Sequence, residues 1–203
     1  MSFQKIFVLS MNYDEKIAVM GGSFDPVHLG HVQLAINAKN SLNLDKVIFL
    51  PCQQSPHKSI KPSANSNQRI EMLILATSDY DWIEISEWET NLPPPSYSVN
   101  SAKHFQKQHP KSELFWIIGN DQWEKINTWK KIDELVKIVT FIVFPRDGEE
   151  PKLNPDFKSH FINYNFNASS TEVRQNIETN KHTGLPIDPK VLEYINENSL
   201  YSS

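Results

Sequence analysis

The chain has 203 residues and a formal net charge of -4, so it is long enough for a sizeable core and offers no broad cationic surface for a nucleic acid. Its single cysteine, Cys52, excludes an internal disulfide and is typical of a cytoplasmic protein. No stretch reaches the roughly 18 apolar residues of a membrane span, so we expect no membrane partner.

Short apolar runs alternate along the chain with segments of helical periodicity. The runs cover residues 17–20, 46–50, 82–85, 114–118, 138–144 and 161–162. Helices are predicted from about residue 29, over 67–77 with Ser66 as cap, after Ser98 as cap to about residue 108, from 169–170, and after Pro189. This order predicts an α/β fold, a Rossmann-like doubly wound parallel sheet covered by helices on both faces, with a small helical part at the C-terminus.

The chain is predicted to form one domain over residues 16–203. Residues 1–15 are predicted to be an N-terminal extension, either an extra edge strand or a ragged terminus, without the small-residue cleavage site of a signal peptide. In parallel sheets, ligands bind beyond the carboxyl ends of the strands. Polar motifs follow three of the predicted strands, at Gly21-Gly22, after Pro51 and at Gly119.

The densest of these motifs joins the first strand to the first helix. It reads GGSFDPVHLGH over residues 21–31 and places His28 and His31 three residues apart, about one helical turn. Glycines allow a ligand to approach the backbone, and the start of a helix binds anions. The stretch matches neither the Walker A loop nor G-x-G-x-x-G. A glycine turn with two surface histidines is the simpler interpretation of each part taken alone.

This stretch resembles the signature of the nucleotidyltransferases that carry an H-x-G-H motif, and more closely that of the bacterial nicotinate-mononucleotide adenylyltransferases. Ser23 stands where the family usually has threonine. The resemblance implies transfer of AMP from ATP to nicotinate mononucleotide, giving deamido-NAD and pyrophosphate in NAD biosynthesis, with Mg²⁺ arriving with ATP. It implies catalytic roles for His28, His31 and Arg174, and ATP contacts from Gly21, Gly22, Ser23, Phe24, Gly119, Asp121, Ser169 and Ser170.

Further motifs extend the resemblance to the mononucleotide side. Pro56-His57-Lys58 resembles the family's loop whose lysine contacts a substrate phosphate, although a solvated polar loop is the alternative. Pro95-Ser96-Tyr97-Ser98 resembles the family's Pro-Ser-Tyr-Thr, so Tyr97 and Ser98 are expected to hold the nicotinate carboxylate, unless Ser98 is simply a helix cap. Trp129, eight residues after Asp121, is expected to stack on the pyridine ring, and Ser23 to hold the substrate phosphate.

The later motifs concern ATP. Gly119-Asn120-Asp121 ends a predicted strand, and an acid there can accept hydrogen bonds from ribose hydroxyls or satisfy its own turn. The segment 169–174 resembles the family's Ser-Ser-Thr-x-Ile/Val-Arg, so that Ser169, Ser170 and Arg174 form a second anion site, or else only a capped helix.

Two other functions stay open at this level. The chain could be a related nucleotidyltransferase with another acceptor, such as nicotinamide mononucleotide, phosphopantetheine or a sugar phosphate. It could also be a non-catalytic nucleotide-binding module on the same fold. The sequence leaves the oligomeric state undecided.

Overall fold

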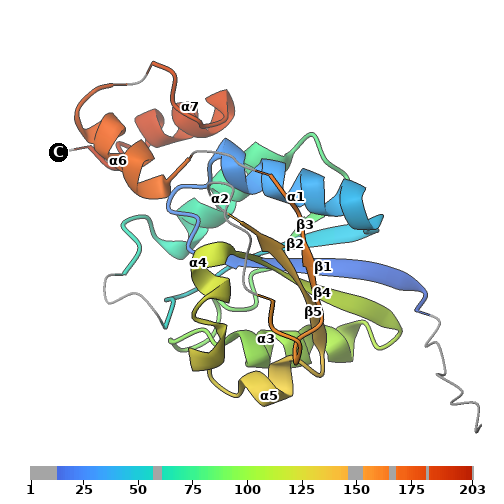
Figure 1. Cartoon of the computed structure of the whole chain (residues 1–203). Coiled ribbons are helices and arrows are strands. Elements are labelled where there is room, and N and C mark those ends of the chain that lie inside the picture. The colour runs from blue at the N-terminus through green and yellow to red at the C-terminus, as the bar shows by residue number, and fades with distance from the viewer. Residues whose placement is uncertain (1–12, 57–60, 146–152, 165–167, 182, 203) are drawn as a thin grey trace, which may run out of the picture.

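A computed structural model describes residues 13–56, 61–145, 153–164, 168–181 and 183–202 (Figure 1). Its strands are β1 (Glu15–Gly22), β2 (Lys46–Pro51), β3 (Ile83–Ile85), β4 (Ser112–Gly119), β5 (Val139–Phe144) and β6 (Ser159–Phe161). Its helices are α1 (Leu29–Leu42), α2 (Ser66–Thr77), α3 (Ser98–Gln108), α4 (Asn120–Trp123), the 3₁₀ turn η1 (Ile126–Thr128), α5 (Ile132–Leu135), α6 (Ser170–Glu178) and α7 (Pro189–Glu197).

The strands form one parallel sheet in the order β3-β2-β1-β4-β5-β6. The chain therefore winds outward from β1 on one side and returns to β4 on the other, as the doubly wound prediction requires. The strand order reverses between β1 and β4, which makes their carboxyl ends a topological switch point. Residues 21–31 and the turn at Gly119 both follow these ends, so the sheet brings the two predicted ATP motifs together.

Alternate residues of the strands feed two separate cores. Ala18 and Met20 of β1 face a core that α1, α2, α6 and α7 cover, whereas Ile17 and Val19 face a core covered by α3, α4, η1 and α5. Figure 1 shows these two helical layers on opposite faces of the sheet. Because α6 and α7 share the first core with α1, the C-terminal helical part packs on the same sheet as the rest of the chain.

The structure corrects two predicted helix caps. Asn65, rather than Ser66, caps α2: its Oδ1 accepts a hydrogen bond from the Gln68 backbone N–H (3.0 Å), and the Gln68 Oε1 accepts one from the Asn65 backbone N–H (2.9 Å). Tyr97 rather than Ser98 precedes α3, with extended backbone, and Ser98 is the helix's first residue. Each helix starts one residue before the position predicted, because a serine followed by a helical pattern is equally compatible with the cap and with the first turn.

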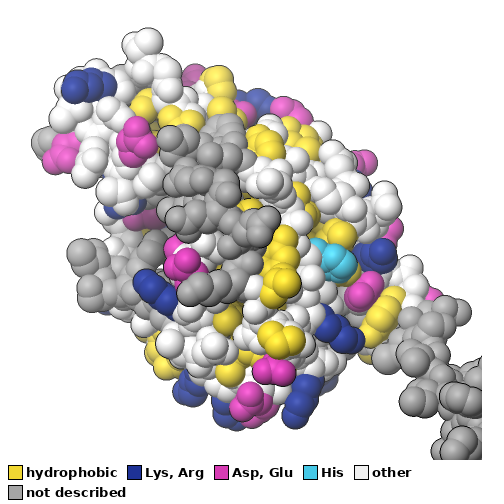
Figure 2. Space-filling view, in the orientation of Figure 1, with side chains coloured by type: hydrophobic (Ala, Val, Ile, Leu, Met, Phe, Trp, Pro, Cys, Tyr) yellow, Lys and Arg dark blue, Asp and Glu magenta, His cyan; other side chains and the backbone are white. Residues whose placement is uncertain are grey.

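The start of the chain also differs in detail from the prediction. β1 begins at Glu15, inside the predicted extension, and Asp14 donates its backbone N–H to the Lys111 carbonyl (3.0 Å). Residues 1–12, which carry the apolar patch at 6–9, lie outside the described residues. Among the described residues, no helix is long and apolar enough to cross a membrane. Basic and acidic side chains are interspersed on the face seen in Figure 2, in keeping with the net charge of -4.

Candidate active site

Two histidines stand where β1 passes into α1. His28 directly precedes α1 with extended backbone, and His31 lies in the first turn. Their rings are stacked with centroids 3.7 Å apart, so they lie on the same side of the helix, as their spacing predicts. The His31 Nδ1 accepts a hydrogen bond from the His28 backbone N–H (3.2 Å). A neutral imidazole that accepts through Nδ1 carries its proton on Nε2, so His31 has an Nε2–H to donate.

The Phe24 side chain packs against His31. Its ring is buried, with an edge-to-face contact to His31 (centroids 5.0 Å apart) and a tilted contact to Phe49 (5.5 Å). Its φ of 47° lies in the left-handed region, which is unusual for a bulky residue. A Cβ at Gly22 would lie 2.8 Å from the Phe24 Cζ, whereas one at Gly21 would meet only Trp116, at 3.6 Å. The structure therefore adds a packing reason for Gly22, which sequence reasoning had explained only by the approach of a ligand.

A buried arginine holds the backbone of Ser23. Arg69 of α2 is 1% exposed, and its Nη1 donates to the Ser23 carbonyl oxygen (2.7 Å). Burial lowers the pKa of the Arg69 guanidinium, while Cys52 and Asp25 act in the opposite direction. The Ser23 Oγ lies 3.8 Å from the Cys52 Sγ, at the end of β2. Ser23 is partly exposed, so its hydroxyl and backbone stand at the edge of the switch point.

Asp25 is the centre of a polar cluster within the histidine loop, residues 21–31. Its buried carboxylate accepts hydrogen bonds from the backbone N–H groups of Ser63 (2.8 Å) and Ala64 (3.0 Å) and from the Tyr201 hydroxyl (2.8 Å). Burial, together with the Asp25 charge and hydrogen bond, raises the pKa of Tyr201 far above its ordinary value, so Tyr201 stays protonated and donates. The C-terminal end of the chain is thus attached directly to the histidine loop.

The start of α6 lies against the same loop. The Ser170 Oγ donates to the Pro26 carbonyl oxygen (2.8 Å), and the Arg174 Nη1 donates to the Asp25 carbonyl oxygen (2.6 Å). The Arg174 Nη2 donates to the Thr171 Oγ1 (3.3 Å), and its side chain is 30% exposed. Ser169 is the residue that precedes α6. The predicted second anion site therefore adjoins the histidines, and Ser170 and Arg174 also hold the backbone that carries them.

The turn after β4 contributes Gly119 and Asp121. Gly119 precedes the short helix α4, and Asp121 lies in its first turn with an exposed side chain. A Cβ at Gly119 would lie 2.8 Å from the Asp121 Oδ1, so the glycine gives the carboxylate room to fold back over the turn. Trp116 and Trp123, predicted to be packing residues, are both buried in the core under α3.

The predicted pyridine residues Tyr97 and Trp129 both lie on the α3 side of the sheet. Tyr97 and Trp129 are partly buried and pack against the same core cluster, although 32 positions separate them in the sequence. The Nζ of Lys130 lies 4.1 Å from the centroid of the Tyr97 ring, a cation–π contact. Ser98 opens α3, whose first turn presents backbone N–H groups that intrahelical bonds do not use. Lys58 falls outside the described residues.

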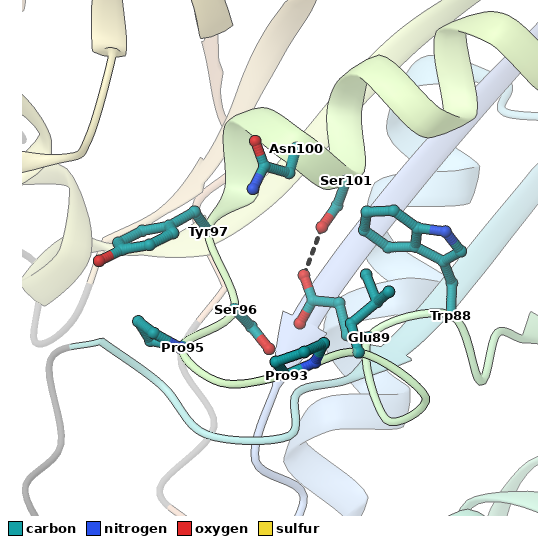
Figure 3. A pocket seen from close by; sticks show the side chains of 9 residues that line it. Trp88, Glu89, Pro93, Pro95, Ser96, Tyr97, Asn100 and Ser101 are labelled. Atoms are coloured by element: carbon teal, nitrogen blue, oxygen red, sulfur yellow. Dashed lines mark hydrogen bonds between the residues drawn. The ribbon is translucent and has the colours of Figure 1, made fainter.

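A pocket opens beside the start of α3 (Figure 3). Glu89 is its one acidic lining residue; the lining residues are Trp88, Glu89, Leu92, Pro93, Pro95, Ser96, Tyr97, Asn100 and Ser101. The Ser101 Oγ donates to the Glu89 Oε1. Burial raises the pKa of the Glu89 carboxyl, while hydrogen bonds with Ser101 and Ser96 act in the opposite direction. Tyr97, one of the predicted pyridine residues, therefore also lines this pocket.

Sequence reasoning gave no role to Arg69, Glu89 or Tyr201. Arg69 sits beside the apolar stripe of α2, and a charged residue at a core-facing position was the available signal. Glu89 lies in an irregular, proline-bearing stretch without periodicity. Tyr201 lies near the C-terminal end of the chain, and its contact with Asp25 spans 176 positions and carries no local pattern.

The chain is similar to known proteins over most of its length. The family model described as Cytidylyltransferase-like matches residues 19–176. A relative from Methylacidiphilum infernorum is 38% identical over 187 residues, which cover 92% of each chain, and one from Listeria monocytogenes is 39% identical over 92% of this chain and 97% of its own. Both carry the name nicotinate-nucleotide adenylyltransferase.

Solved structures with the same fold are more distant in sequence. Two structures of the Plasmodium falciparum nicotinic acid mononucleotide adenylyltransferase, one complexed with NaAD and one with APC, give TM-scores of 0.72 and 0.73 at 21% identity. Each comparison covers 92% of this chain and 97% of the other. At this identity the likeness shows the fold alone.

Proposed function

The chain belongs to the cytidylyltransferase-like family and, within it, to the nicotinate-nucleotide adenylyltransferases, and we propose that it transfers AMP from ATP to nicotinate mononucleotide, giving deamido-NAD and pyrophosphate. The observation that carries the proposal is the pair of stacked histidines at the start of α1, beside the switch point of the sheet. This position combines a helix N-terminus with two ring donors, which suits the phosphates of a nucleotide.

The reaction requires positioning more than proton transfer. A phosphate oxygen of nicotinate mononucleotide attacks the α-phosphorus of ATP in line, a new P–O bond forms, and the bond to the bridging oxygen of pyrophosphate breaks. The attacking oxygen is already ionised at neutral pH, so no general base is needed. Catalysis then comes from holding the two phosphates in line and stabilising the charge that develops on the phosphoryl oxygens and on pyrophosphate.

We assign the donors from the site geometry. His31 donates through Nε2 to an oxygen of the transferring phosphoryl group, because its Nδ1 accepts from the His28 backbone. His28 lies stacked beside it and donates to a neighbouring ATP oxygen. Ser23 and the backbone at Gly22 and Phe24 hold the mononucleotide phosphate. Arg174, 30% exposed, supplies positive charge toward the pyrophosphate end of ATP.

The remaining predicted residues fit the two nucleosides. Gly119 and Asp121 receive the ATP ribose, and Ser169 and Ser170 extend the phosphate site. Trp129 stacks on the pyridine ring, the amides at Tyr97 and Ser98 hold its carboxylate, and Lys58 reaches the mononucleotide phosphate. Mg²⁺ enters as part of the MgATP substrate, with ligands from phosphate and water. Within the described residues, no group of three or more His, Cys, Asp or Glu side chains is arranged to bind a metal ion.

The experiment is a direct assay of both products. Purified protein is incubated with MgATP and nicotinate mononucleotide, and deamido-NAD and pyrophosphate are measured together. Nicotinamide mononucleotide and phosphopantetheine serve as alternative acceptors, and we expect nicotinate mononucleotide to be favoured at least about a hundredfold in kcat/KM, because amide donors facing an uncharged carboxamide lose charge-assisted hydrogen bonds.

The His31→Ala variant links activity to the site. We expect its kcat to fall by roughly 10²-fold or more, the scale of removing one preorganised donor, with the fold intact.

The assay of the wild-type chain also separates the alternative functions. Binding of ATP without formation of product would identify a nucleotide-binding module instead. Product with another acceptor only would identify a related nucleotidyltransferase. We also infer a cytoplasmic location. The single cysteine and a substrate pair found in that compartment support this inference.

A further inference from the structure

Glu89 is an unusual residue for the irregular segment between β3 and α3. It belongs to neither element, yet it is only 5% exposed, and its carboxyl lies behind the first turn of α3 (Figure 3). The Ser101 side chain, fully buried in that turn, donates its hydroxyl to the carboxyl. The Ser96 hydroxyl, just before the helix, acts on the same carboxyl and lowers its pKa.

These contacts continue across the molecule. The Ser96 Oγ accepts the backbone N–H of Gln53 (3.2 Å), and the Ser96 N–H donates to the Gln54 carbonyl oxygen (3.0 Å), which ties the start of α3 to the loop after β2. The Gln53 Oε1 in turn accepts from the Ser66 Oγ (2.9 Å).

The same series of hydrogen bonds reaches the phosphate side of the site. The Arg69 Nη2 donates to the Ser66 Oγ (3.3 Å), and its Nη1 donates to the Ser23 carbonyl oxygen (2.7 Å). Hydrogen bonds therefore join Ser96, which precedes α3 beside Glu89, to Ser23, at the predicted phosphate site.

Packing alone does not account for a carboxyl at this position. Burying a carboxyl costs solvation energy, and an apolar side chain of similar volume would pack against α3 without that cost. An apolar side chain would, however, leave the buried Ser101 hydroxyl without its acceptor and release the start of α3 from this contact.

We propose that Glu89 is a positioning residue for the mononucleotide: through Ser101 it holds the start of α3 so that the backbone amides at Tyr97 and Ser98 face the pyridine carboxylate at the correct distance from Ser23. The inference rests on the proposed function. It assigns Glu89 no contact with the substrate, so its effect should appear in mononucleotide recognition and not in ATP binding.

The test compares Glu89→Ala and Glu89→Gln with the wild-type chain, and with Glu87→Ala, a change at an exposed glutamate two residues away. For Glu89→Ala we expect the KM for nicotinate mononucleotide to rise about tenfold, the scale of a lost buried hydrogen bond, and the KM for ATP to stay within about twofold. The preference for nicotinate over nicotinamide mononucleotide should fall with it.

The conservative variant separates positioning from bulk packing. The amide oxygen of Glu89→Gln can still accept from Ser101, so its KM values should stay within about threefold of wild type. Ser101→Ala, which removes one donor without filling space, should repeat the Glu89→Ala pattern in milder form and serves if Glu89→Ala fails to fold.

Three results would overturn the inference. They are equal changes in both KM values, an unchanged nicotinate preference in Glu89→Ala, and no difference between Glu89→Ala and Glu87→Ala. A wild-type chain that makes no deamido-NAD would instead overturn the proposed function and this inference together, so the two failures are distinguishable.

Discussion

The substitution Gly22→Ala tests how the end of β1 positions the histidines. A Cβ at this position would lie 2.8 Å from the Phe24 Cζ and 3.0–3.1 Å from both Cε atoms, so it would clash with the far end of the ring. Ordinary contact begins near 3.4 Å, and the ring must therefore retreat by about 0.6 Å. Phe24 is 2% exposed and lies against Phe49 and His31, so it cannot retreat without moving one of them.

Two effects of different size should follow. Overpacking a buried site costs about 1–3 kcal/mol, so the free energy of unfolding should fall by that amount. Movement of the Phe24 ring displaces His31, and a misplacement approaching 1 Å can cost about 10²-fold in rate, so we expect kcat to fall by roughly ten- to a hundredfold.

Gly21→Ala is the matched control. Its Cβ would lie 3.6 Å from the Trp116 Cζ2, an ordinary contact, so the free energy of unfolding should stay close to the wild-type value. Urea unfolding and steady-state kinetics on both variants provide the measurements. Wild-type kcat in Gly22→Ala, or equal losses in the two variants, would refute the link from Gly22 through Phe24 to His31.

Three further changes test other parts of the site. Tyr201→Phe removes the hydroxyl that donates to the Asp25 carboxylate (2.8 Å) and should lower the free energy of unfolding by about 1.5–3 kcal/mol. Tyr194→Phe is the control, and equal, small losses of unfolding free energy in the two variants would show that the contact contributes nothing. Trp129→Ala should raise the KM for nicotinate mononucleotide roughly ten- to a hundredfold, from a stacking energy of about 1–3 kcal/mol, and a rise in the KM for ATP instead would place Trp129 on the adenosine side. Burial raises the pKa of Glu89 above 4.5, so the folded chain holds that proton to higher pH than the unfolded chain, and the free energy of unfolding should decline as pH rises above 4.5. In Glu89→Gln the free energy of unfolding should decline less over the same range, and parallel curves for the two chains would contradict this assignment.

The local patterns of the sequence were sufficient to predict the fold class and the position of the main motif. Apolar runs such as 46–50 and 138–144 are too short for helices and lie between periodic segments, which is enough to predict a parallel α/β sheet. The pairing of His28 with His31 also follows from sequence alone, because residues one turn apart at a helix start share a side.

Only the tertiary structure decided which side chains support the motif. Asp25 meets Tyr201 across 176 positions, Arg69 reaches back 46 positions to Ser23, and Glu89 is buried in a stretch with no periodicity. Periodicity reports which face of an element is apolar, but a buried hydrogen bond depends on where two distant elements meet. That meeting is set by the strand order and by the helices packed on each face, which no local segment specifies.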